Sequence, residues 1–453
     1  MKKVLSVILA VFTALAVTAC SEENGSLSDN PGNDFDSTLP QCEPANLPDA
    51  GNLIRQCIMK GEDGFYYTDM TMLADKNVTR ALCYYDMTTQ TSIPLCAKPQ
   101  CMHDGNDFCV ATGGGAYSFY GSLTALYNGC IYRLGADSSD AEEWKLSLLR
   151  TDLQGNELSE VATICTFKTS EDSIKPQIAS ALFHCGKLFA AVSDMENNAK
   201  TTLYVADIAS GDVRTINMPS PEEGVTEAIG ATCSDMIADG EWLYYTMRHV
   251  KEDKYHFYFE YDRTMLYRYN VRTGVTENIP AMPDIYSSFT VVHDIIYYTT
   301  VDTSNNTFSL YSYDIKKDKT EALSEKVQQE CLKGEYLYQQ DKVTVCTDRS
   351  YLYVCTNGME GQYVKDNGLQ SDVDFYIYDM EGKELLHGLT GMKPDSENYS
   401  YGFSAIDGTI YFNLSDYDMT GEELTGLYTV NTEDLINGKT DWTKLYVLHQ
   451  YIA

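Results

Sequence analysis

A two-part pattern repeats seven times along this sequence and constrains its fold more than any other feature. The clearer part reads Leu-Tyr-x-Tyr-Asp, then an apolar residue, two variable residues and Gly; its copies lie at residues 266–274, 203–211, 310–315, 375–382, 82–87, 148–153 and 427–431. The other part is a turn with Gly or Asp followed by an apolar and aromatic run, found at residues 63–67, 128–132, 185–189, 239–245, 293–298, 348–353 and 407–411. Because the two parts alternate strictly, the chain is built from seven similar units.

Each unit is predicted to form two β-hairpins. Apolar residues recur at period two, which places alternate side chains of a strand on one face. A marker Asp or Asn then turns the chain by accepting hydrogen bonds from its own backbone, and a following Gly supplies a positive φ. Residues 275–279 and 157–161 have the pattern of the returning strands. The markers are Asp86, Asp152, Asp207, Asn270, Asp314, Asp379 and Asn431.

The predicted fold is all-β: a β-propeller of four-stranded antiparallel blades. Seven blades are expected, or six or eight if one weak copy is miscounted, and the uneven spacing of the markers suits blades with inserted loops. A double β-sandwich is the alternative, but it gives no reason for seven regular alternations. Composition agrees with a sheet protein, since 35 tyrosines accompany only 15 phenylalanines and 3 tryptophans. Tyrosine suits half-buried sheet positions where the ring is packed and the hydroxyl reaches water.

The first twenty residues have the form of an export signal. Two lysines precede an apolar stretch, residues 4–17, that is too short to span about 30 Å of hydrocarbon as a helix. Residues 15–20 read Leu-Ala-Val-Thr-Ala-Cys and resemble the lipobox of bacterial lipoprotein signals. The resemblance implies a signal peptide over residues 1–19 and lipidation of Cys20 after cleavage. An ordinary secretory signal with a chance cysteine is the alternative.

The rest of the chain is expected to be attached to the membrane through this lipidated cysteine. Residues 20–50 combine the lipidated cysteine with a flexible acidic tether rich in Ser, Asn, Asp, Gly and Pro, and residues 51–453 form the propeller domain. Such a chain is held at the cell membrane by its lipid and faces the extracellular side. Acidic residues outnumber basic ones 66 to 33, so nucleic acid is not expected as a partner. Anionic lipid headgroups would also repel the acidic surface, so the lipid on Cys20 must hold the protein at the membrane.

Together these features resemble the Firmicutes-type lipoproteins that carry a YWTD, receptor-like β-propeller of uncharacterised function. The resemblance covers residues 54 to about 447 and implies a fold rather than an activity. The sequence has no G-x-S-x-G elbow, H-E-x-x-H, P-loop or Rossmann glycine pattern, so no catalytic residue is predicted. The hypothesis is a binding module for an unidentified glycan, peptide or protein, with unknown ligand-binding residues. The alternative is a lyase or hydrolase with carboxylates gathered at the central channel.

One segment concentrates residues that can bind a metal. Cys96, Cys101, His103 and Cys109 follow the first unit with the spacing C-x4-C-x-H-x5-C. Three thiolates and an imidazole are a ligand set of tetrahedral structural zinc, although this spacing is not a usual zinc pattern. A disulfide between two of the three cysteines, or a plain loop, is the favoured interpretation, and no other cofactor is expected. Further cysteines in apolar runs are expected to be free thiols: Cys83, Cys130, Cys185, Cys346 and Cys355.

Overall fold

The computed structural model describes the chain between Ile58 and Tyr446, with gaps. The chain divides into two compact units, Met1–Thr38 and Leu39–Ala453, and every described residue belongs to the second. Cys20, the signal and the tether lie outside the described residues, as do residues 73–77, 104–108, 114–117, 128, 138–141, 169–174, 195–199, 217, 219–227, 252–259, 281–287, 303, 306, 329–342, 357–373, 390–398, 417–425 and 440–441.

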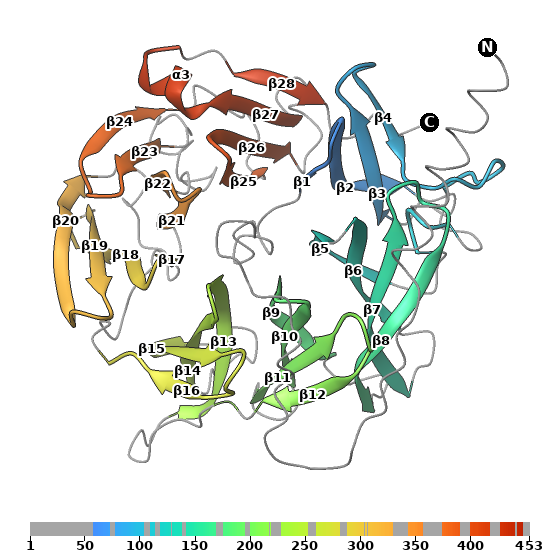
Figure 1. Cartoon of the computed structure of the whole chain (residues 1–453), viewed down its shortest axis with the longest axis horizontal. Coiled ribbons are helices and arrows are strands. Elements are labelled where there is room, and N and C mark those ends of the chain that lie inside the picture. The colour runs from blue at the N-terminus through green and yellow to red at the C-terminus, as the bar shows by residue number, and fades with distance from the viewer. Residues whose placement is uncertain are drawn as a thin grey trace, which may run out of the picture. The chain divides into compact units, whose positions relative to one another are not determined.

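The described residues form seven four-stranded antiparallel sheets, each made from consecutive strands and arranged as the blades of a propeller (Figure 1). Blades 1 and 2 comprise β1 (Ile58–Lys60), β2 (Gly64–Met72), β3 (Val78–Asp86) and β4 (Thr91–Pro94), then β5 (Ser118–Tyr127), β6 (Cys130–Asp137), β7 (Glu143–Asp152) and β8 (Leu158–Lys168). Blades 3 and 4 comprise β9 (Gln177–His184), β10 (Lys187–Asp194), β11 (Lys200–Asp207) and β12 (Val213–Ile216), then β13 (Ala228–Asp239), β14 (Trp242–Lys251), β15 (Glu260–Asn270) and β16 (Thr276–Asn278).

The remaining blades follow the same order. Blades 5 and 6 comprise β17 (Ser288–Val292), β18 (Ile295–Asp302), β19 (Thr307–Asp314) and β20 (Lys319–Gln328), then β21 (Val343–Thr347), β22 (Tyr351–Thr356), β23 (Asp374–Asp379) and β24 (Glu384–Leu389). Blade 7 comprises β25 (Tyr399–Ile406), β26 (Thr409–Asp416), β27 (Gly426–Asn431), the short helix α3 (Thr432–Ile436) and β28 (Thr443–Tyr446). Within the described ranges, no helix combines the length and apolar character needed to span a membrane.

These sheets confirm the all-β propeller of four-stranded antiparallel blades and its number of seven. The part of each repeat with a turn and an aromatic run forms the turn before the second strand of a blade and that strand itself, as residues 239–245 do at β14. The Leu-Tyr-x-Tyr-Asp part forms the third strand and the turn after it, as residues 266–274 do at β15. The expected returning strands are the short outer strands, such as β16.

The marker residues turn the chain as predicted. At the end of β15, Asn270 Oδ1 accepts hydrogen bonds from the backbone N–H groups of Arg272 at 3.0 Å and Thr273 at 2.9 Å, and Gly274 has a φ of 72°. Asn431 instead caps α3, because its side chain accepts from the N–H of Asp434. The other markers also accept from backbone N–H groups that follow them: Asp86, Asp152, Asp207, Asp314 and Asp379.

The apolar core is divided among the seven joints between neighbouring blades, with one buried cluster at each joint. Consecutive tyrosines on second strands explain how one blade serves two joints. Tyr244 packs in the cluster with blade 5, whereas Tyr245 packs in the cluster with blade 3, because successive side chains of a strand point to opposite faces. The pairs Tyr66–Tyr67 and Tyr297–Tyr298 divide in the same way.

Several tyrosine hydroxyls bond to the neighbouring blade, which adds to the expectation from composition that they reach water. A buried hydroxyl needs a hydrogen-bond partner, and the turns of the next blade provide one. Three hydroxyls donate across a joint: Tyr66 to the Leu153 carbonyl at 3.3 Å, Tyr244 to Asp294 Oδ1 at 3.4 Å and Tyr297 to the Met380 carbonyl at 3.1 Å. A fourth, on Tyr127, accepts from the Gly186 N–H at 2.7 Å.

Among the described residues, blades 7 and 1 are joined through side chains, because each blade is a contiguous piece of the chain. The rings of Phe65 and Tyr411 pack edge to face with centroids 5.7 Å apart within a cluster that includes Leu427. Lys60 and Asp407 form an ion pair at 3.8 Å, but both side chains are more than half exposed, so the pair contributes little. Apolar packing therefore provides most of the closure.

Gly155, in the turn after β7, should tolerate alanine much less well than Gly129. Both glycines have a φ of +72°, but a Cβ on Gly155 would lie 2.5 Å from the carbonyl oxygen of Leu95, whereas a Cβ on Gly129 would meet nothing within 4 Å. Gly129→Ala should cost about 1–2 kcal/mol for the left-handed conformation alone, and Gly155→Ala about 1–3 kcal/mol more for the steric overlap. Denaturant unfolding of both variants would test this, and equal losses would contradict the close contact.

Candidate functional site

The Cys–His segment forms a compact group of potential metal ligands after blade 1. The sulfur atoms of Cys96, Cys101 and Cys109 and a ring nitrogen of His103 all lie within 4.8 Å of one another. Cys109 is buried, and the other three residues are partly buried. These residues are close together along the sequence, and in the structure their four potential ligand atoms face one another. We refer to them as the Cys–His cluster.

The three cysteines of the cluster are not joined to one another in the structure, where all three are free thiols. Of the two interpretations favoured from the sequence, a disulfide or a plain loop, the disulfide is therefore not present in the structure. Nδ1 of His103 lies 3.5 Å from Sγ of Cys109. Elsewhere, Cys185 was expected to be a free thiol but is disulfide-bonded, so the apolar run around it did not decide its chemical state.

Backbone N–H groups point at the sulfur atoms of the cluster. Burial disfavours ionisation of Cys96, but N–H groups of Lys98 and Val110 bond its sulfur and bring the pKa of Cys96 below its usual value. The N–H of His103 bonds Cys101, yet burial and the neighbouring thiols raise the pKa of Cys101 to about 11. The cluster can thus hold a thiolate at Cys96, whereas ionisation of Cys101 is disfavoured.

The residues after Cys109 enter the joint between blades 1 and 2, where they meet a buried arginine. The carbonyl of Ala111 accepts the N–H of Leu82 at 2.9 Å and Nη1 of Arg133 at 2.8 Å, and Val110 O lies 3.3 Å from the same Nη1. Arg133, on β6, is only 1% exposed. Burial lowers the pKa of Arg133 to about 9, and the sulfurs of Cys83 and then Cys109 oppose this fall, so the guanidinium remains charged at neutral pH.

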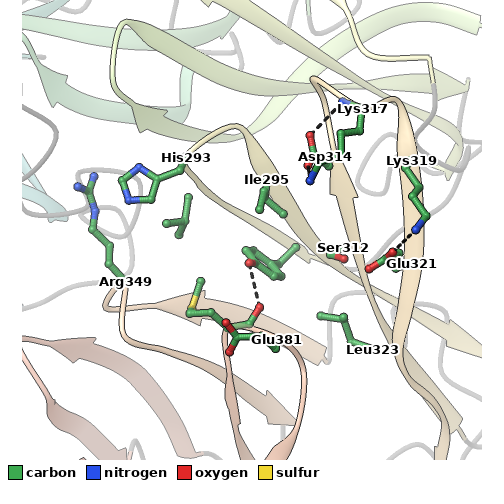
Figure 2. A pocket seen from close by; sticks show the side chains of 13 residues that line it. His293, Ile295, Ser312, Asp314, Lys317, Lys319, Glu321, Leu323, Arg349 and Glu381 are labelled. Atoms are coloured by element: carbon green, nitrogen blue, oxygen red, sulfur yellow. Dashed lines mark hydrogen bonds and ion pairs between the residues drawn. The ribbon is translucent and has the colours of Figure 1, made fainter.

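A second candidate site is a cavity of about 460 Å³ between blades 5 and 6 (Figure 2). It lies where turns of blade 5 meet the turns at Arg349 and Glu381 of blade 6. Part of its lining is apolar or aromatic: Val292, Ile295, Tyr297, Leu323 and Met380. The rest is polar or charged: His293, Ser312, Asp314, Lys317, Lys319, Glu321, Arg349 and Glu381. We refer to this as the 5–6 cavity. Its residues are distributed over the four strands of blade 5 and the turns of blades 5 and 6, so no sequence motif marks it.

Charges around the 5–6 cavity are matched. Lys317 and Asp314 form an ion pair at 2.7 Å, and this bond to lysine lowers the pKa of the Asp314 carboxyl. Lys319 pairs with Glu321 on the same strand (Figure 2). With cations and carboxylates interleaved, the cavity does not have the one-sided charge of a phosphate or nucleic-acid site. It suits a ligand that brings an apolar group and polar groups of both kinds.

Turns from three blades also hold titratable groups together. Nε2 of His184 lies 2.7 Å from the carbonyl of Gly240, which joins blades 3 and 4. Arg349 reaches from blade 6 to Asp239 of blade 4 at 3.4 Å, and Asp239 is only 6% exposed. An enzyme with central carboxylates would use such groups, but here the carboxylate is engaged by a guanidinium and the imidazole by a carbonyl. Their contacts support a role in holding the turns together.

Burial of His184 should make stability depend on mildly acidic pH. Burial lowers the pKa of His184 to about 4, whereas an unfolded histidine titrates near 6.5. The unfolded chain therefore takes up this proton first, and the stability from neutral His184, up to about 3 kcal/mol, is lost as the pH falls from about 6.5 toward 4. Denaturant unfolding at several pH values should show a shallower decline for His184→Gln. The exposed-site variant His293→Gln should keep the full decline, and equal declines in all three proteins would refute the argument.

The sequence matches no protein-family model and no curated protein. Among solved structures it resembles a puromycin-hydrolysing peptidase of Mycobacterium tuberculosis, with 12% identity and a TM-score of 0.49 over 89% of this chain and 56% of that one. It also resembles a prolyl endopeptidase, with 9% identity and a TM-score of 0.50 over 88% of this chain and 52% of that one. A third similar structure is the β-propeller domain of the Trilobed protease from Pyrococcus furiosus, with 14% identity and a TM-score of 0.46 over 87% of this chain and 98% of that one. The chain spans just over half the length of the first two. At these identities the likeness concerns the fold alone.

Proposed function

We propose that this chain is a membrane-anchored binding module that works outside the cytoplasm, with a lipid on Cys20 and a peptide or protein segment as its ligand. The 5–6 cavity is the observation that carries the binding proposal. Its volume of about 460 Å³ lies in the range of pockets that enclose small ligands, and its lining combines apolar side chains with charges of both signs. An apolar side chain of the ligand would enter the cavity, while its polar groups meet the ion pairs.

The lining favours a peptide over a glycan. A sugar is commonly held against an exposed aromatic face, but Tyr297, which lines the cavity, is only 3% exposed and its hydroxyl is bonded to the Met380 carbonyl. Leu323 and Met380 instead provide an aliphatic surface, on which apolar side chains bury area favourably. The alternative of a lyase or hydrolase lacks comparable support, since the central groups Asp239 and His184 are engaged in contacts between turns.

Ser312→Trp should block binding by filling the 5–6 cavity. Ser312 lines the cavity and is partly exposed, so an indole could project into the space without displacing the core. The full protein, applied to an immobilised array of random-sequence peptides, should retain a subset of peptides, and Ser312→Trp should reduce that signal at least tenfold. Glu325→Trp, at an exposed position of the same blade outside the described lining, is the matched control and should keep it. Retention of glycans but no peptides on parallel arrays would refute the peptide assignment.

Cys20→Ser should release the protein from the membrane. Without the thiol no lipid can be attached, and the acyl chains that contribute about 0.8 kcal/mol per buried methylene are lost. Fractionation of cells that express the protein should move it from the membrane to the soluble fraction, and labelling with radioactive palmitate should disappear. Cys42→Ser, which changes another cysteine of the tether, should remain lipidated and bound. Unchanged labelling of Cys20→Ser would disprove the anchor.

A further inference from the structure

We propose that the Cys–His cluster binds one Zn²⁺ and that this ion fastens a segment of the chain into the joint between blades 1 and 2. The site is separate from the 5–6 cavity and does not depend on the proposed binding function. It would be a structural metal site, with three thiolates and one imidazole as ligands.

The separation between His103 and Cys109 is that of two ligands in a tetrahedral site, and the other ligand atoms lie near enough for one ion to draw them together. Zinc lies about 2.3 Å from sulfur and 2.0–2.1 Å from nitrogen, which sets sulfur and nitrogen about 3.5 Å apart and two sulfurs about 3.8 Å apart. The observed separation of His103 Nδ1 and Cys109 Sγ is 3.5 Å, and all four ligand atoms lie within 4.8 Å of one another. Four side chains complete the tetrahedron, so no position is left for substrate, which is the property of a structural site.

The backbone around the cluster prepares the sulfurs for a metal. N–H groups of Lys98 and Val110 bond Cys96, and the N–H of His103 bonds Cys101. Groups that donate to coordinated atoms orient them and stabilise their charge. Soft thiolates together with an imidazole select zinc over magnesium or calcium, which prefer oxygen.

Arg133 supplies the charge that such a site needs. One Zn²⁺ with three thiolates and a neutral imidazole has a net charge of −1, and a buried charge is costly unless it is compensated. The Arg133 guanidinium is buried in the joint beside the cluster. It also donates to the carbonyls of Val110 and Ala111, which directly follow that ligand. The same side chain thus holds the residues that follow Cys109 and places a buried positive charge near the end of the site.

The position of the site explains its use. Among the described residues, the joint between blades 1 and 2 has the smallest apolar cluster, with five buried members: Met59, Tyr66, Leu82, Leu95 and Ile131. The other joints have between seven and seventeen. Residues of this joint flank the metal ligands on both sides: Leu95 directly precedes Cys96, and Val110 and Ala111, whose carbonyls bond Arg133, directly follow Cys109. A bound ion would therefore strengthen the joint between blades 1 and 2.

Metal analysis of the purified full protein tests the proposal. The protein should be prepared under reducing conditions with zinc supplied, and its metal content measured by inductively coupled plasma mass spectrometry. We expect one zinc per chain in the wild type and less than a tenth of that in Cys101→Ser. Cys130→Ser is the matched control, because Cys130 is also a partly buried cysteine but belongs to blade 2; this variant should keep its zinc.

Two further measurements keep the proposal falsifiable if Cys101→Ser does not fold. Replacement of zinc by cobalt in the wild type should give the thiolate charge-transfer absorption and the intense d–d bands of a tetrahedral site. His103→Cys should retain the metal, because thiolate replaces imidazole, whereas His103→Ala should bind it at least tenfold more weakly in competition with a chelator. A wild-type protein without metal under these conditions would overturn the proposal, as would an intact mass lower by two hydrogens that peptide mapping assigns to a disulfide within the cluster.

Discussion

Packing of one blade against the next is the interaction on which the rest of this structure depends. A four-stranded sheet with two apolar faces cannot bury either face by itself, and here each face is covered by a neighbouring blade. The Tyr244–Tyr245 pair shows the principle, since one ring is buried in the joint on each side. Both candidate sites also lie at joints, where side chains and turns of two blades approach each other. The sites are therefore consequences of how adjacent blades meet.

The repeat allowed the blades to be predicted because its information is local. Asn270 and Gly274 lie four residues apart and define a turn on their own, so the sheets and their number follow from residues close in sequence. The 5–6 cavity could not be predicted, since it combines turns near His293 and Glu381 that become neighbours only when two blades pack. Burial of Arg133 was missed for the same reason: a charged residue in a strand is usually exposed, and the carbonyls of Val110 and Ala111 meet this one only when blades 1 and 2 pack. The four ligands of the Cys–His cluster were found by residue type, but their convergence was not.

The chain as a whole is strongly acidic, whereas the charges that line its 5–6 cavity are balanced. A net charge of −33 opposes non-specific contact with other anionic molecules. Around the 5–6 cavity, in contrast, Lys317, Lys319 and Arg349 lie among three carboxylates in the lining. The cavity is thus a nearly neutral region on an acidic protein. A ligand recognised there would be selected by shape and by apolar contact more than by charge.

Closure of the ring by side chains has a consequence for the order in which the protein folds. Each blade is a continuous stretch of chain with mainly local contacts, so it can form as soon as that stretch is available. The face of blade 1 that carries Phe65 and Tyr67 must wait for Tyr411 and Leu427, which lie near the opposite end of the sequence. Until then this apolar face is open to solvent and to other chains, which is the situation that favours aggregation or exchange of blades between molecules. The first blade to be made is the last to be fully covered.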